Sequence, residues 1–265
     1  MKANTYLFGY GSLICSKSRG VTSPELRNRP AIPVTVKGVE RTWSKRCARG
    51  MTAMGVRFRE QARCAGVLVP LASEEELALF DEREQGYVRH RIPLEDVQKV
   101  PFLPTKEYHE HSDFLDTLQN LQEDSGSDMD FSDMDDDGNS TVTSQQDDDE
   151  SLDIWVYVPQ KTRAPSMEYP IVQSYVDTIM RGCMDVGGEP FVAEFLNTTA
   201  GWHPEEWQDQ HYADDDTIDQ VWVDDRSDPI YPRGEPQHFR KHGPTYDRLI
   251  EHYRSDDFEI RIGKD

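Results

Sequence analysis

The sequence has no long apolar run and no paired spacing of cysteines. No stretch approaches the ~20 apolar residues of a membrane-spanning helix, so no such helix is expected. The first residues, MKANTYLFGYGS, lack the apolar core of a secretory signal. The four cysteines (Cys15, Cys47, Cys64 and Cys183) show no C-x-x-C spacing. We therefore expect free thiols in a reducing, cytoplasmic setting.

Basic residues are also few: 29 Lys and Arg stand against 50 Asp and Glu, a net charge of −21 over 265 residues. The stretch from Glu107 to Asp153 holds 17 acidic residues and no Lys or Arg, and the rest of the chain has a net charge of only −4. A chain without a basic stripe would be repelled by phosphate groups. We therefore expect neither nucleic acid nor a membrane as a partner.

The acidic stretch has too few apolar residues to offset the entropy of ordering it, and mean hydropathy of the whole chain is −0.77. We predict one domain over residues 1–265, interrupted by a disordered acidic insertion at about 105–151. An irregular extension is expected over about 203–265, apart from a helix at Thr245–Tyr253. An acidic insertion of this kind would suit a basic protein partner.

The insertion contains a pattern that matches a calcium-binding loop only in part. Asp133, Asp135, Asp137 and Gly138 occupy positions 1, 3, 5 and 6 of an EF-hand loop, but position 12 is Ser144, where a glutamate is needed. In so Asp-rich a stretch such a match arises by chance. We expect no metal and no cofactor.

Strand and helix patterns alternate through the rest of the chain. Ser73 with Glu76 forms a capping-box pattern for a helix that ends before Gly86. The other expected helices begin with early prolines. The expected strands are Tyr6–Leu13, Ile32–Val39, Met54–Phe58, Ala65–Pro70, Tyr87–Pro93 and Asp153–Pro159, and the expected later helices are Pro170–Asp185 and Glu189–Thr198.

The stretch FGYGSL, Phe8–Leu13, places two glycines at the end of the first strand. A dinucleotide fingerprint would need a third glycine where Ile14 stands, and the GK[ST] of a phosphate-binding loop is missing. Ser12 lacks the flanking glycines of a nucleophile elbow. A tight turn of purely structural purpose stays open, as does close approach of the backbone to a ligand.

A second stretch, DEREQGY at Asp81–Tyr87, closes the helix that begins after Ser73. Carboxylates in such a run are usually solvated. Glu84, however, lies near the helix C-terminus, where the helix dipole disfavours a negative charge. If Glu84 also faced a cleft, both effects would raise its pKa toward that of a useful general base.

FGYGSL followed by REQGY resembles the γ-glutamylcyclotransferase-like family, and Pro170–Thr199 is similar to the C-terminal part of one subfamily. The FGYGSLI motif is also similar to the glutathione-specific ChaC branch, but Cys15-Ser16 replaces that branch's aromatic continuation. The resemblance implies an α+β fold built around a small mixed β-barrel with flanking helices. It also implies that Glu84 is the catalytic carboxylate. The implied substrate-binding residues are Phe8, Gly9, Tyr10, Gly11, Ser12, Leu13, Tyr87 and Tyr157.

The implied reaction converts a γ-glutamyl compound into 5-oxoproline and a released amine, amino acid or peptide. Ring closure of this kind needs positioning and a base, which matches the missing cofactor motifs. Two alternatives stay open. One is a non-catalytic binding module on the same fold, and the other is an enzyme specific for γ-glutamylamines.

Overall fold

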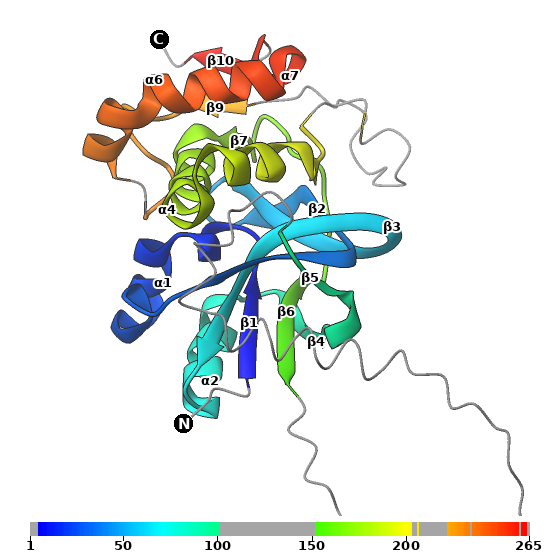
Figure 1. The fold of residues 1–265 in the computed structure, drawn as a ribbon. Coiled ribbons are helices and arrows are strands. Elements are labelled where there is room, and N and C mark those ends of the chain that lie inside the picture. Colours follow the sequence, from blue (N-terminus) through cyan, green and yellow to red (C-terminus); the bar gives the residue numbers. More distant parts are fainter. Residues whose placement is uncertain are drawn as a thin grey trace, which may run out of the picture.

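The computed structural model describes residues 5–100, 152–202, 206, 222–233, 235–259 and 261–263. It has an α+β fold in which helices pack against a large mixed sheet (Figure 1). The expected acidic insertion at 105–151 lies outside the described residues. Within them, no helix combines the length and apolar character needed to cross a bilayer. All four cysteines are free thiols.

The strands form two sheets and the helices flank them. The large sheet contains β1 (Thr5–Gly9), β2 (Ile32–Cys47), β3 (Met51–Leu71), β4 (Tyr87–Arg91), β5 (Val97–Lys99), β6 (Asp153–Pro159) and β8 (Thr199–Ala200). The small sheet contains β7 (Ile171–Val172), β9 (Trp222–Asp224) and β10 (Arg261–Gly263). The helices are α1 (Ser16–Thr22), α2 (Glu74–Arg83), α4 (Gln173–Asn197), α6 (Pro236–Tyr253) and α7 (Ser255–Glu259), with short 3-10 turns η1 (Ser12–Ile14), η2 (Pro24–Arg27) and η3 (Leu94–Asp96).

The expected β-barrel is wrong, because the large sheet is open. Among the described residues its strand order is β4-β6-β1-β3-β2-β5, with β8 also paired to β2, so β4 and β5 are edges that do not pair with each other. The long strands β2 and β3 pair along most of their length, with register shifts near Gly38 and Ser44 that bend the pair. The curvature therefore comes from bulges rather than from closure.

Most elements of the first half match the expected ones, with changed ends. The strand expected at Tyr6–Leu13 stops at Gly9, where the chain turns into η1. The two strands expected within 54–70 are one continuous strand, β3. Ser73 caps α2, since its hydroxyl accepts a hydrogen bond from the Glu76 N–H. The strand expected at Asp153–Pro159 is present with those bounds as β6.

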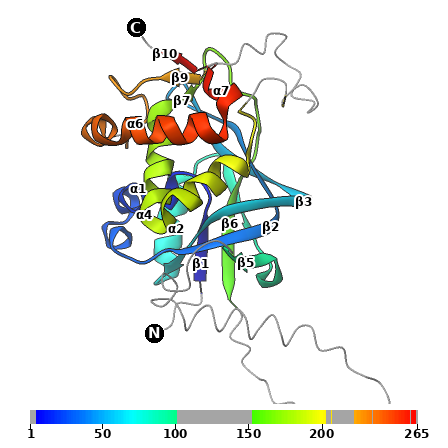
Figure 2. The ribbon, with the colours of Figure 1, turned by 45° about the horizontal axis from the view of Figure 1, so that its top comes forward.

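The second half departs further from expectation. The two expected helices after Pro170 form one element, α4, whose path breaks at Gly187 and Gly188, and Gly188 has a φ of 65°. The helix expected at Thr245–Tyr253 is present as the second half of α6. The rest of the expected irregular extension contains β9, the first half of α6, α7 and β10. Helix α6 begins at Pro236 and continues through Pro244, burying a stripe of side chains at helical spacing. It packs against α4, which it crosses in the view of Figure 2.

Arg41 on β2 is a fully buried guanidinium that joins three parts of the fold. Its five N–H groups make five hydrogen bonds, which is all that this side chain can donate. They reach the carbonyls of Tyr10 in the turn after β1 and Ala65 in β3, at 3.1 and 2.7 Å. The remaining three reach the end of α4 and β8, at the Phe195 carbonyl, Thr198 Oγ1 and Thr199 Oγ1.

Replacing Arg41 with methionine should lower the free energy of unfolding by about 3 kcal/mol or more. Five hydrogen bonds from a charged donor would be lost, and each such bond typically contributes ~1.5–3 kcal/mol. Urea unfolding followed by circular dichroism measures this. The matched control is Arg59→Met, which removes an exposed arginine of β3 paired to Glu40 and should cost at most ~1 kcal/mol. Equal effects of the two changes would contradict the role of Arg41.

Candidate active site

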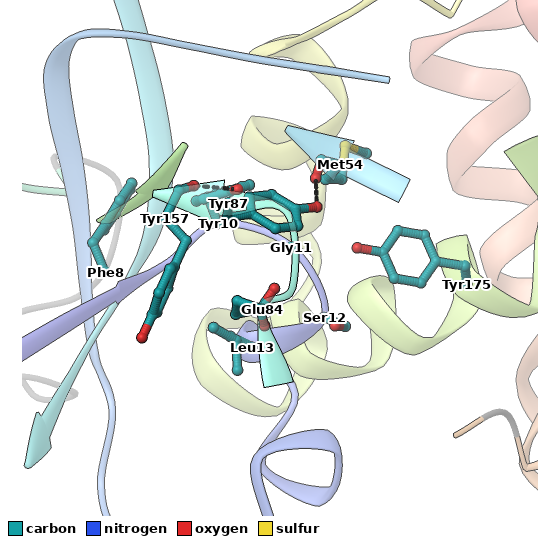
Figure 3. Close-up of a pocket in the computed structure, with 10 residues that line it drawn as sticks. All are labelled: Phe8, Tyr10, Gly11, Ser12, Leu13, Met54, Glu84, Tyr87, Tyr157 and Tyr175. Atoms are coloured by element: carbon teal, nitrogen blue, oxygen red, sulfur yellow. Dashed lines mark hydrogen bonds between the residues drawn. The ribbon is translucent and has the colours of Figure 1, made fainter. Parts of the chain in front are cut away.

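One small pocket opens between β1, the turn that follows it, and the C-terminal end of α2 (Figure 3). Its volume is about 30 Å³, more than one water molecule needs. Among the described residues that line it, Glu84 is the one with an acidic side chain. The lining residues are Phe8, Tyr10, Gly11, Ser12, Leu13, Met54, Glu84, Tyr87, Tyr157 and Tyr175. The pocket thus brings Glu84 and the Tyr10–Leu13 turn together.

The turn is held in a 3-10 conformation by two of its own hydrogen bonds. Ile14 donates to the Gly11 carbonyl at 2.9 Å, and Cys15 donates to the Ser12 carbonyl at 3.2 Å. The N–H groups of Ser12 and Leu13 are not used in this turn. A Cβ on Gly11 would lie 3.0 Å from the Tyr175 hydroxyl and 3.2 Å from Met54 Cβ. Glycine is therefore needed here for close approach of the backbone to the pocket wall.

Gly9 is the one predicted substrate-binding residue that does not line the pocket. It ends β1, where a Cβ would lie 2.9 Å from the Leu13 Cβ. Its carbonyl oxygen would in turn lie 2.6 Å from a Cβ on Gly66 of β3. The role of Gly9 is thus to let the turn fold back tightly onto the sheet.

Glu84 is the C-cap residue of α2, and its N–H donates to the Phe80 carbonyl at 2.8 Å. Its side chain is largely buried, with 17% exposed. Figure 3 shows the carboxyl group between the Ser12–Leu13 turn and the rings of Tyr10 and Tyr87. A carboxylate in this position faces the turn with few competing water molecules.

Burial raises the pKa of Glu84 above its usual value, because it disfavours the charged carboxylate. The positive charges of Arg83, Arg233 and Lys45 oppose this and lower the pKa, as does a hydrogen bond from Arg83. Two opposing effects therefore set the pKa of Glu84. Such a balance suits a group that must both take up and release a proton.

Arg83 fixes Glu84 relative to the turn. Its Nε lies 3.0 Å from Glu84 Oε1, while its Nη2 donates to the hydroxyls of Ser12 and Ser18 at 3.1 and 3.2 Å. Its Nη1 donates to the Ser18 carbonyl and to Thr22 Oγ1 on α1. One guanidinium thereby links the carboxylate, the turn and the helix after it. Ser12 serves here as an acceptor rather than as an activated nucleophile.

Four tyrosines make up most of the remaining pocket wall. Burial raises the pKa of Tyr10, Tyr87, Tyr157 and Tyr175, so all four remain neutral near pH 7. The Tyr10 hydroxyl donates to the Tyr157 carbonyl at 2.6 Å, and the Tyr87 hydroxyl donates to the Met54 carbonyl at 2.9 Å (Figure 3). The wall is therefore rigid and uncharged, which leaves acid–base chemistry to Glu84.

Sequence reasoning missed five residues around this pocket. Met54 and Tyr175 line it, and the charges of Arg83, Lys45 and Arg233 act on Glu84. For Arg83 there was a local signal, since it directly precedes Glu84 in the helix. The other four arrive from distant parts of the chain through tertiary packing. Among the described residues, no cluster of His, Cys, Asp or Glu is arranged to hold a metal ion.

Comparisons with known proteins are sparse. No family model and no curated protein matches the sequence. One similar solved structure is a gamma-glutamyl cyclotransferase, with a TM-score of 0.42, 11% identity, and coverage of 69% of this chain and 80% of that one. Another is an uncharacterized protein from Homo sapiens, with a TM-score of 0.41, 12% identity, and coverage of 69% and 79%. At TM-scores this low, neither similarity says what this chain does, and its function is inferred from the pocket.

Replacing Glu84 with glutamine should stabilise the protein at neutral pH. Because folding raises the pKa of Glu84, its contribution to stability is largest below the unfolded pKa of about 4.3 and is lost as pH rises through the folded value. Urea unfolding at about pH 4 should therefore give similar stabilities, and at pH 7 the variant should be the more stable protein. Glu82→Gln, at an exposed position of α2, is the control and should follow the wild type at both pH values. A Glu84→Gln protein that is less stable than wild type at pH 7 would contradict the burial argument.

Proposed function

We propose that this chain is an enzyme that converts a γ-glutamyl compound to 5-oxoproline, with Glu84 as the general acid and base. The observation that carries the proposal is the placement of one buried carboxylate opposite a glycine-containing turn in a pocket of otherwise neutral side chains. The FGYGSL and REQGY stretches, which led to the family resemblance, supply these two halves of the pocket.

The γ-glutamyl group would lie along the turn. The backbone N–H groups of Ser12 and Leu13, which the 3-10 turn does not use, are suitable donors for an oxygen of the substrate. Tyr87 and Tyr157 would then pack against the glutamyl chain. This arrangement holds the α-amine within ring-closing reach of its own γ-carbonyl.

Glu84 would first accept a proton from the α-ammonium group. The free amine attacks the γ-carbonyl carbon, a C–N bond forms, and negative charge develops on the carbonyl oxygen. Preorganised N–H groups of the turn would stabilise this oxyanion without reorganisation. The ionised form of Glu84 is required for this step, and Arg83 favours it.

Glu84 would then return the proton to the nitrogen of the leaving group. The bond between the γ-carbon and that nitrogen breaks, and the second proton lost by the ring nitrogen also passes through Glu84 to the leaving nitrogen. The products are 5-oxoproline and the leaving group in its ammonium form. The atoms of the substrate are fully distributed over the two products, so no water or other reactant enters. One carboxyl group thus serves as base and then as acid.

The proposal also includes a cytoplasmic location and a basic protein partner for residues 105–151.

The alternative function is that of a non-catalytic binding module, which would keep the pocket without needing a proton-transferring group. Assay of 5-oxoproline from glutathione, γ-glutamyl amino acids and γ-glutamylamines separates the two, since a binding module releases none from any of them.

Glu84→Gln should reduce 5-oxoproline release by at least ~100-fold, since it removes the proton-transferring group while keeping the shape of the side chain. Product is measured by chromatography and folding by circular dichroism. Glu82→Gln, in the same helix but exposed, should retain full activity. Near-native turnover by a folded Glu84→Gln protein would refute the mechanism.

Arg83→Gln should move the acidic limb of the kcat/KM profile to higher pH. Arg83 lowers the pKa of Glu84 by its charge and by a hydrogen bond, so its loss raises that pKa and a higher pH is needed to ionise the base. Lys45→Gln should shift the limb in the same direction by a smaller amount, since Lys45 acts through charge alone. Arg59→Gln is the charge-matched control and should leave the limb in place. A shift to lower pH in Arg83→Gln would contradict the assignment.

A further inference from the structure

Arg233, in the C-terminal part of the chain, comes two residues after Tyr231, whose ring packs against that of the pocket residue Tyr175. Arg233 acts electrostatically on Glu84, although about 150 residues separate the two in sequence. Its side chain is half-buried, and its Nε is buried without a hydrogen-bond partner among the described residues. A buried N–H without a partner costs free energy, and an anionic ligand would satisfy it.

The segment that carries Arg233, from Asp225 onward, is anchored firmly to α4. The buried carboxylate of Asp225 accepts hydrogen bonds from the Ser174 N–H and hydroxyl, at 2.7 and 2.6 Å. Arg226 forms a two-point ion pair with the buried Asp177 and another with Asp247 of α6. The start of the segment is therefore fixed next to the helix that supplies Tyr175 to the pocket.

The other end of the segment is fixed as well. The ring of Tyr231 packs edge-on against that of Tyr175, with centroids 4.7 Å apart, and its hydroxyl lies 3.3 Å from Ser18 Oγ. Beyond Arg233, the carboxylate of Glu235 accepts hydrogen bonds from Lys17 and Arg181, at 3.0 and 2.9 Å. Arg233 thus lies between two anchors, and its position near Glu84 is built into the fold.

The charges around Glu84 do not balance. Arg83, Lys45 and Arg233 place three positive charges about one carboxylate. The N–H groups of Arg83 are occupied by serine and threonine oxygens and by Glu84, and Lys45 donates to the Gly86 carbonyl at 3.2 Å. Arg233 is the member of this group with a buried N–H left over. The site is therefore complementary to a ligand with excess negative charge.

We propose that Arg233 binds the carboxylate of the leaving amino acid, so that the preferred substrates are γ-glutamyl amino acids rather than γ-glutamylamines. The inference rests on the proposed function. The γ-glutamyl part of any substrate is a zwitterion, whose α-carboxylate is balanced by its α-ammonium group. A leaving amino acid adds one unbalanced carboxylate, and a leaving amine adds none. Arg233 is not among the residues that line the pocket for the γ-glutamyl group, so in this proposal it contacts the part of the substrate that extends beyond that group.

The test compares γ-glutamylalanine with γ-glutamylethylamine, which differ only by the carboxylate of the leaving group. We expect kcat/KM of the wild type to be about 10- to 100-fold higher for γ-glutamylalanine, the usual effect of losing a charged hydrogen bond. Both rates are measured on the pH plateau above the acidic limb, where Glu84 is ionised whether or not Arg233 lowers its pKa. There, Arg233→Gln should bring this ratio close to one by lowering the rate with γ-glutamylalanine alone. Arg233→Lys should keep part of the ratio, because it keeps the charge without the planar fork. Arg240→Gln, at an exposed position of α6, is the matched control and should change neither rate.

The outcomes separate this inference from the proposed function. If both compounds give 5-oxoproline but the wild-type ratio is near one, or Arg233→Gln lowers both rates equally, the contact is wrong while the reaction stands. The second result would place Arg233 on the α-carboxylate instead. If no compound gives product, the proposed function is wrong.

Calorimetric binding of the two compounds to Glu84→Gln protein, with and without Arg233→Gln, then decides the contact. Tighter binding of γ-glutamylalanine that is lost with Arg233→Gln supports it. Equal binding of the two compounds, or no binding of either, overturns it.

Discussion

The pocket depends on the buried guanidinium of Arg41. Arginine keeps its charge in proteins, so its burial is tolerable only if every N–H group finds an acceptor. Here those acceptors come from the turn at Tyr10, from β3 at Ala65 and from the end of α4. The three parts must therefore be in place together. The turn and β3 also supply Tyr10 and Met54 to the pocket wall, so Arg41 helps to fix that side of the pocket. Tyr175 comes from the other end of α4, before the break at Gly187 and Gly188.

Arg83 holds the carboxylate of Glu84 in place, as Arg41 holds part of the pocket wall. Burial alone would favour a protonated Glu84, and an exposed ion pair would favour a permanently ionised one. Arg83 supplies a positive charge while its other N–H groups hold Ser12, Ser18 and Thr22. The charge that tunes Glu84 is thus fixed to the turn that would face the substrate. The side chain of Arg83 therefore affects both the pKa of Glu84 and its position relative to the turn.

Sequence patterns predicted the features of this arrangement that depend on neighbouring residues, but few of those that depend on long-range contacts. The Ser73 cap, the glycine turn and the position of Glu84 at a helix end follow from neighbours within a few residues, and the structure contains each of them. Whether β4 and β5 pair to close a barrel depends on long-range geometry that no local pattern encodes. Of helix α6 only the second half was expected, as Thr245–Tyr253, because Pro236 and Pro244 resemble loop residues. Pro236 starts the helix, and Pro244 is tolerated inside a helix whose buried stripe packs on α4.

The C-terminal part of the chain has an irregular composition, but specific contacts attach it to α4. Strand β9 pairs with β7, and β7 leads directly into α4, where Asp177 is buried and depends on Arg226 for its counter-charge. Losing one partner of such a pair leaves an uncompensated buried charge, so this segment cannot leave α4 without a large cost. Because α4 also presents Tyr175 to the pocket, displacing the segment would disturb the pocket as well. The residues after β9 therefore support the pocket, and they include Arg233, whose buried Nε has no hydrogen-bond partner among the described residues.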